Sequence, residues 1–294
     1  MPKLTRFKNF QGIQGIFLSG LITLLITSSL SREAYSSDST LPRYREFTIE
    51  NATALNKLRQ ELTAEEMTLV LKINRRDASH LQSGLKLVIP EDFQDPDRYS
   101  PFPLQLPRLS EIPKIIFVSR RVQAFAAYEN GVLVRWGPTS TGRKEQATPA
   151  TLYHATWKSR LRRSSINRSW LMPWYVNIHT SMGVGLHQYA MPGYPASYGC
   201  IRLFKDDAYW VFHWTDQWES RNGRTAESFG TPVIVFGDYD YDQPPPWTHL
   251  AEFPEAASVS KQELEGLLDR YLWVLLERNG KSGQKSDHEL SGSD

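Results

Sequence analysis

The sequence holds one cysteine, Cys200, and a histidine shortly before it, His187, and these two side chains could perform nucleophilic chemistry. A thiolate is a strong nucleophile where a neighbouring group lowers the thiol pKa or takes its proton, and histidine is the usual neighbour. The Pro- and Gly-rich segment between them can fold back so that they meet. A single cysteine excludes an intramolecular disulfide and is too few for a structural zinc or iron–sulfur site. We therefore interpret Cys200 as a free, reactive thiol.

The residues around Cys200 have types that suit acyl transfer. Gly199 allows a tight turn ahead of the nucleophile, and the backbone N–H groups of residues 198–200 can then point at a developing oxyanion. Arg202 is placed to hold a substrate carboxylate or a neighbouring carbonyl. Ser197 is expected to orient the loop by hydrogen bonding, because no base is better placed for its hydroxyl.

Other side chains near this segment have alternative interpretations. His179 competes with His187 as the base, although it lacks the Gly-aliphatic-His context. A zinc hydrolase using both histidines and Cys200 is a rival hypothesis, but the sequence has no HExxH-type spacing. Aromatic side chains either line a substrate groove or pack in the core. Those considered for substrate binding are Trp174, Tyr175, Tyr194 and Tyr198.

Strand-like segments separated by Gly and Pro predict a mostly β domain that positions these residues. Asn130-Gly131 has the composition of a hairpin turn. A helix is expected to begin near Asp206, where acidic residues suit a helix N-terminus. The expected strands are residues 114–119, two within 122–141, and residues 151–157, 174–179, 184–187 and 231–237.

The segment from His187 to Arg202 resembles the catalytic signature of the L,D-transpeptidases of the YkuD family. That pattern is a histidine, a short loop, then Ser, a residue that is commonly His, Gly, Cys, an aliphatic residue, and Arg or Asn. Here it reads His187, then Ser197-Tyr198-Gly199-Cys200-Ile201-Arg202, so Tyr198 departs from the commonest residue. Thr148-Pro149 and Met172-Pro173-Trp174 add to the resemblance, which covers roughly residues 112–238.

This resemblance implies a mainly β catalytic domain, a YkuD-like sandwich or barrel with a few helices, that acts on peptidoglycan stem peptides. Cys200 is then the nucleophile and His187 the general acid and base, with no metal or organic cofactor. The thioester formed with release of D-alanine from a stem tetrapeptide passes to an acceptor amine in the transpeptidase. The alternatives are an L,D-carboxypeptidase, in which water is the acceptor, and a non-catalytic peptidoglycan-binding scaffold.

Residues 44–92 have a pattern of their own, in the order strand, helix, helix, strand. Their sequence LVLKINRRDASHLQSGLKLVIP resembles a LysM module, a small glycan-binding α+β fold, although Glu50-Asn51-Ala52-Thr53 replaces the usual Gly-Asp-Thr. Two interpretations fit this sequence: a module that binds glycan strands, and a spacer of the same fold that has lost this binding. The expected elements are residues 45–49, 54–60, 64–72 and 85–89.

The N-terminal segment is typical of an export signal. Lys3, Arg6 and Lys8 precede an apolar run over residues 16–30, and polar sequence follows it. Residues 1–36 are expected to be either a cleaved signal peptide or an uncleaved anchor in the inner membrane. Either reading predicts a location in the cell envelope, in the periplasm or cell wall.

The charge balance argues against a nucleic-acid partner. The 34 basic and 32 acidic side chains leave a formal net charge of +2, which provides no field for binding a polyanion along the whole molecule. The 294 residues, 40% of them hydrophobic, are enough for one large or two smaller domains. A local basic cluster in residues 157–170 either faces carboxylates of envelope polymers or is a solvated loop.

The remaining segments are expected to connect and flank the two domains. Residues 93–111 are Pro-rich, which favours an extended linker. Residues 239–280 comprise a further linker and an amphipathic helix over 260–279, with Ser260 and Glu263 as a capping box and Gly280 after its end. Residues 281–294 are expected to be disordered.

Overall fold

The computed structural model describes residues 41–220 and 226–289. The chain divides into two units, residues 1–40 and 41–294, and all described residues belong to the second. The predicted export signal lies outside the described residues. Within the described ranges, no helix combines the length and apolar character needed to cross a membrane.

The first elements form the predicted order of strand, two helices and strand. Asn51 and Thr63 cap the two helices by accepting hydrogen bonds from backbone N–H groups, and Thr63 forms a capping box with Glu66. The two strands pair antiparallel. Leu58, Val70 and Ile89 are among the residues that form the core of this module. The elements are β1 (Tyr44–Thr48), α1 (Ala52–Glu61), α2 (Ala64–Ile73), the short 3-10 helix η1 (Ala78–His80) and β2 (Lys86–Pro90).

A five-stranded sheet is the centre of the following domain, with strand order β5-β4-β3-β13-β6. Successive side chains of a strand point to opposite faces, so Ile115 and Phe117 enter one core while Ile116 and Val118 enter another. Both faces are therefore covered. Asn130 and Gly131, each with positive φ, make the predicted hairpin turn between β4 and β5. The strands are β3 (Ile115–Ser119), β4 (Ala124–Glu129), β5 (Val132–Pro138), β6 (Leu152–His154) and β13 (Pro232–Phe236).

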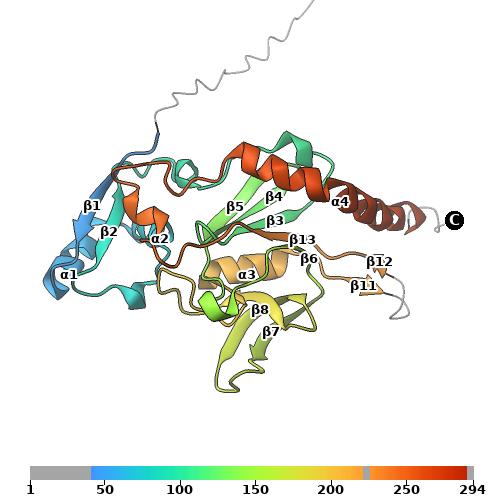
Figure 1. Cartoon of the computed structure of the whole chain (residues 1–294), viewed down its shortest axis with the longest axis horizontal. Coiled ribbons are helices and arrows are strands. Elements are labelled where there is room, and N and C mark those ends of the chain that lie inside the picture. The colour runs from blue at the N-terminus through green and yellow to red at the C-terminus, as the bar shows by residue number, and fades with distance from the viewer. Residues whose placement is uncertain (1–40, 221–225, 290–294) are drawn as a thin grey trace, which may run out of the picture. The chain divides into compact units, whose positions relative to one another are not determined.

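A second, four-stranded sheet, of order β10-β9-β8-β7, carries the cysteine segment at one edge. One face of this sheet and helix α3 pack against the five-stranded sheet, and their apolar side chains share one core cluster. Figure 1 shows α3 on one side of β3–β5 and α4 on the other. The elements are β7 (Trp157–Arg163), β8 (Leu171–His179), β9 (Val184–Gln188), β10 (Ile201–Leu203) and α3 (Lys205–Trp214); β11 (Glu219–Ser220) and β12 (Ala226–Ser228) form a separate ribbon.

Residues 93–111 are not the extended linker that their prolines predicted. Tyr99, Phe102, Leu106 and Leu109 are buried in the same core cluster as β3 and β4. Two short 3-10 helices, η2 (Pro96–Tyr99) and η3 (Pro107–Leu109), fold the segment. The large apolar residues between the prolines outweigh the tendency of proline to extend the chain.

The C-terminal helix is longer than expected. α4 (Lys261–Glu289) begins after Ser260, whose hydroxyl accepts a hydrogen bond from the Glu263 N–H at 3.0 Å. It continues through Gly280, where the prediction ended it, because one glycine costs a helix only about 1 kcal/mol. Leu264, Leu268 and Leu275 anchor its first half in the core. Residues 281–289, predicted to be disordered, belong to this helix, and residues 290–294 lie outside the described residues.

Candidate active site

The parallel pairing of β9 with β10 brings the chemistry-bearing residues together. His187 is the register partner of Arg202, and Leu186 is the partner of Ile201. Cys200 lies immediately before β10, two residues from Arg202, so the pairing of β10 with β9 brings it to the same edge of the sheet as His187. All three side chains line one pocket. The loop between His187 and Cys200 therefore folds back as the sequence predicted.

His187 is held in the tautomer that a general base requires. Its ring is 3% exposed, and its Nδ1 lies 2.9 Å from the Gln188 carbonyl oxygen. A carbonyl can only accept, so Nδ1 carries the proton and Nε2 keeps a free electron pair. Burial, and to a smaller extent the charge of Arg202, lowers the pKa of His187 to about 4. The imidazole is consequently neutral near pH 7 and able to accept a proton.

The Cys200 thiol is protonated in the resting site. Burial raises its pKa above the ordinary value, while the Gly185 backbone N–H and the charges of Arg162 and Arg202 oppose that effect. The thiol donates to the Gly183 carbonyl oxygen, with 3.5 Å between sulfur and oxygen. A neutral thiol beside a neutral imidazole needs proton transfer during the attack, because no preformed thiolate is stabilised.

Ser197 fixes the turn in front of Cys200. Its Oγ donates to the Cys200 carbonyl at 2.5 Å and accepts from the Gly199 N–H at 3.1 Å. Gly199 has a φ of +101°, a backbone conformation that favours glycine, and its carbonyl accepts from Thr148 Oγ1 at 2.9 Å. Because the Gly199 N–H is bonded to Ser197, the N–H groups of Tyr198 and Cys200 are the candidate oxyanion donors in this loop.

Arg202 supports the loop rather than extending into open solvent. Its guanidinium donates to the Ala190 carbonyl at 3.3 Å and to the Ala196 carbonyl at 2.9 Å. Its Cζ lies 4.7 Å from the centre of the Tyr189 ring. Of the two roles considered for this residue, contact with neighbouring carbonyls is the one present in the structure.

Aromatic side chains form the walls of the pocket. The Tyr198 ring lies 5.3 Å from the ring of Trp170, and the Arg143 guanidinium stacks over Tyr198 at 4.1 Å. Trp170 belongs to the connection between β7 and β8, which thereby covers one side of the site. The lining residues are Ser164, Ile166, Trp170, Met172, His187, Tyr189, Ser197, Tyr198, Cys200 and Arg202.

Three residues considered from the sequence lie elsewhere. Trp174, with a φ of +54°, packs its ring against Tyr209 and Phe212 of α3 instead of lining the pocket. Tyr194 is 51% exposed, and its carbonyl accepts from Ser140 Oγ. The ring of His179 packs on Tyr153 and its Nδ1 accepts from the Met182 N–H, so the structure does not bring it to Cys200.

Sequence reasoning missed the place of Arg162 near the site and left open where Tyr175 lies. The basic stretch was treated as a loop or surface patch, yet β7 runs through it, and Arg162 stacks over the rings of Trp157 and Tyr175 near the thiol. Tyr175 in turn stacks on His187, with ring centres 5.9 Å apart. Alternating large and basic residues in 157–163 were the available signal for this strand.

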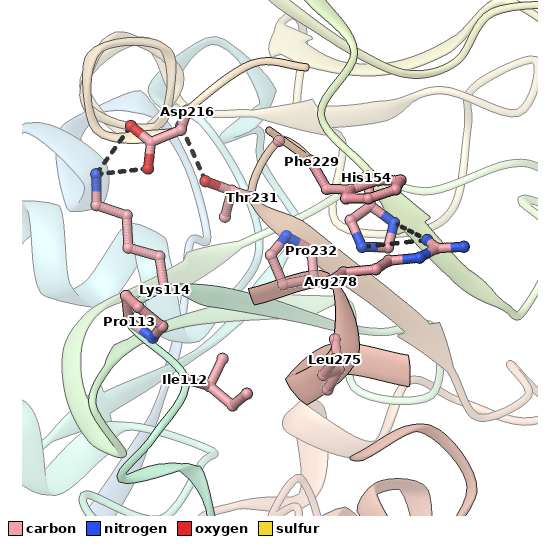
Figure 2. A pocket seen from close by; sticks show the side chains of 11 residues that line it. Ile112, Pro113, Lys114, His154, Asp216, Phe229, Thr231, Pro232, Leu275 and Arg278 are labelled. Carbon is pink, nitrogen blue, oxygen red and sulfur yellow. Dashed lines mark hydrogen bonds and ion pairs between the residues drawn. The ribbon is translucent and has the colours of Figure 1, made fainter. Parts of the chain in front are cut away.

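A second pocket lies between the five-stranded sheet and α4, and it has a different character. Figure 2 shows His154 beside Arg278, and Lys114 paired with Asp216. Burial lowers the pKa of His154 to about 4. Cys200 lines the first pocket and is not among the residues that line this one. Within the described ranges, no three His, Cys, Asp or Glu side chains are arranged to hold a metal ion.

Comparisons with known proteins agree with the chemistry of the first pocket. The family model of the YkuD L,D-transpeptidase catalytic domain matches residues 113–235. This match confirms the catalytic-domain resemblance found in the His187 to Arg202 segment. No curated protein sequence matches the chain.

Several solved structures are also similar to the chain. An L,D-transpeptidase from Stackebrandtia nassauensis is 23% identical, with a TM-score of 0.36, over 43% of this chain and 57% of that chain. L,D-transpeptidase 1 from Mycobacterium tuberculosis is 26% identical, with a TM-score of 0.32, over 42% and 62%. An L,D-transpeptidase from Xylanimonas cellulosilytica is 20% identical, with a TM-score of 0.41, over 67% and 99%. The chain thus spans less than two thirds of the length of the first two.

Proposed function

We propose that this chain is a peptidoglycan L,D-transpeptidase in which Cys200 forms a thioester with a stem tetrapeptide and His187 transfers the proton. One observation carries the proposal: the Cys200 thiol and a neutral imidazole, whose Nδ1 is bonded to a carbonyl and whose Nε2 is left to accept a proton, line one pocket at the edge where β9 pairs with β10. The family match over residues 113–235 supplies the class of substrate.

The first half-reaction forms the acyl-enzyme. The thiol proton passes to His187 Nε2 as the sulfur attacks the carbonyl carbon of the residue before the terminal D-alanine. The carbonyl oxygen becomes an oxyanion, which the N–H groups of Tyr198 and Cys200 stabilise. When the C–N bond breaks, the imidazolium returns its proton to the leaving amine, and D-alanine departs.

The second half-reaction transfers the acyl group. The amine of a second stem peptide attacks the thioester carbon, and His187 accepts a proton from that amine. The C–S bond then breaks, the sulfur recovers a proton, and a new amide links the two stems. Water in place of the amine gives a tripeptide, which is the carboxypeptidase alternative.

The location of the enzyme follows from its substrate. Peptidoglycan lies outside the cytoplasmic membrane, and the basic-then-apolar start of the sequence supports export to the cell envelope. The segment 44–92, with its strand-helix-helix-strand order, supports a LysM-like module beside the catalytic domain. Contact of that module with glycan strands is part of the same proposal.

The test is product analysis with a purified disaccharide-tetrapeptide. We expect release of D-alanine together with a cross-linked dimer, both lost in Cys200→Ala. Tripeptide without dimer, in the presence of excess acceptor, would replace the transpeptidase by the carboxypeptidase. Absence of D-alanine release from folded wild-type protein would leave the non-catalytic scaffold as the better account.

A further inference from the structure

The N-terminal module contacts the loop that joins His187 to Cys200. The Asp77 N–H donates to the Met191 carbonyl at 3.0 Å, and the Met191 N–H donates to Asp77 Oδ2 at 2.7 Å. Met191 is fully buried at this contact. The other carboxylate oxygen, Oδ1, accepts from the Ser79 N–H and lies 2.7 Å from His80 Nδ1. The carboxylate is therefore also held by residues of the N-terminal module itself. Two reciprocal hydrogen bonds therefore join the module to the middle of the catalytic loop.

The neighbouring residues extend this contact. Arg76 and Pro192 form an isolated antiparallel β-bridge. Gly193, with a φ of +89°, lies so close to Arg76 that a β-carbon on it would stand 2.7–2.8 Å from three atoms of the Arg76 side chain. The positive φ favours glycine here, and a β-carbon would in addition displace the Arg76 side chain.

The same loop is held on its other side by the strand that follows Cys200. Arg202 donates to the carbonyls of Ala190 and Ala196, which flank the residues contacted by the module. The loop is consequently fastened from within the catalytic domain by Arg202 and from outside it by Asp77 and Arg76.

The module is itself firmly attached to the five-stranded sheet. The buried Arg75 side chain donates from Nε to the Val122 carbonyl at 3.0 Å. Lys72 Nζ donates to the Trp136 carbonyl at 3.1 Å. These bonds give Asp77 a fixed position relative to the sheet, which a tethered but independent module would lack.

We propose that Asp77 is a positioning residue for acyl transfer, and that the N-terminal module is a structural part of the active site because it holds the His187–Cys200 loop in place. The inference rests on the proposed function of Cys200 and His187. It assigns the module a role that does not depend on glycan binding. Small misplacements of a nucleophile reduce rates strongly, which makes such a clamp measurable.

The test compares Asp77→Ala and Asp77→Asn with Asp95→Ala in the full chain without its signal segment. Asp95 is a matched control: it caps a 3-10 helix by accepting from the Asp97 N–H at 3.2 Å, as Asp77 caps η1, but it does not contact the loop. Each protein is acylated with a carbapenem and with the stem tetrapeptide, and the saturating rate and KM are measured separately. Melting temperatures identify a general loss of stability.

We expect Asp77→Ala to lower the saturating acylation rate about tenfold with little change in KM, and Asp77→Asn to recover most of it, since its amide oxygen can still accept from Met191. Asp95→Ala should acylate at the wild-type rate. Gly193→Ala, which displaces Arg76, should resemble Asp77→Ala and serves if that variant does not fold. Equal rates for Asp77→Ala and Asp95→Ala would overturn the clamp while wild-type acylation still upholds the proposed function. An inactive wild type would overturn the proposed function itself.

Discussion

His187 and Arg202 are register partners in the parallel pairing of β9 with β10. This pairing places the start of β10, which directly follows Cys200, beside β9, and the side chains of His187, Cys200 and Arg202 line one pocket. Backbone pairing therefore sets the level of His187 beside Arg202, and the loop between His187 and Cys200 must also be held in place for the two side chains to meet. Arg202 holds part of that loop by binding two of its carbonyls.

Replacement of His187 should remove the proton transfer. We expect His187→Gln to lower the acylation rate by about 10²- to 10⁴-fold, the usual contribution of a general base. His179→Gln is the control, since His179 lies away from the thiol. Single-turnover acylation by a carbapenem measures both. Comparable losses in the two variants would contradict the assignment of His187.

The activity of the wild type should depend on pH through the same imidazole. The pKa of His187 is lowered to about 4, so the base is neutral above that pH and is lost when the pH falls through it. We expect the acidic limb of kcat/KM to lie near pH 4 rather than near the ordinary histidine value. A limb near pH 6.5 in folded protein would show that the imidazole is not buried as described.

Removal of the Ser197 hydroxyl should disturb the turn but spare the nucleophile. Ser197→Ala loses the bonds to the Gly199 N–H and the Cys200 carbonyl, and we expect about a tenfold lower acylation rate. Ser100→Ala is a close control, because Ser100 makes the same kinds of bond, to the N–H and carbonyl of Phe102, far from the site. Unchanged acylation in Ser197→Ala would mean that the turn does not need its hydroxyl.

Loss of the Trp170 ring should weaken substrate binding more than chemistry. The ring packs against that of Tyr198 in the pocket wall, and among the described residues it makes no ring contact with His187. We expect Trp170→Ala to raise KM for the tetrapeptide several-fold and to change kcat little. Trp273→Ala, on the exposed face of α4, is the control. A fall in kcat without a change in KM would contradict this role.

Much of the site could be predicted because its signal is local in sequence. Residue types at fixed offsets predicted that Cys200, His187 and Ser197 lie together with Gly199, and the first three line one pocket; Asn130-Gly131 predicted a hairpin by its turn preference. Trp174 was misplaced because an aromatic residue beside a signature can face either side of a strand, and here it packs on α3. The contact of Asp77 with Met191 joins residues far apart in sequence, so no local pattern carries it.

The fold, too, was predictable where its signal is local in sequence and not where it depends on distant contacts. Strands and helices with clear periodicity were predicted, whereas residues 93–111 were misread because proline content was weighed above the buried aromatic and leucine side chains. Short strands such as β10 have too few residues for a period of two to be recognised. Their existence depends on a partner strand, in this case β9.

Stability should fall in mild acid because the buried His187 and the partly buried His154 are both held in the neutral form. The pKa of His154 and that of His187 are each lowered to about 4, so the unfolded chain binds protons below pH 6.5 while the folded chain does not. The contribution of these histidines to the free energy of unfolding is thus fully present above pH 6.5. It decreases as the pH falls toward 4, by up to about 3 kcal/mol per histidine. His154→Asn should reduce this pH dependence of the melting temperature. A slope identical to that of the wild type would contradict the burial of neutral His154.

The most direct test of the central claim is intact mass spectrometry of the wild type and Cys200→Ala after incubation with a carbapenem. We expect one covalent adduct on the wild type, which peptide mapping places on Cys200, and no adduct on the folded variant. An adduct of equal yield on Cys200→Ala, or no adduct on folded wild-type protein, would contradict Cys200 as the nucleophile.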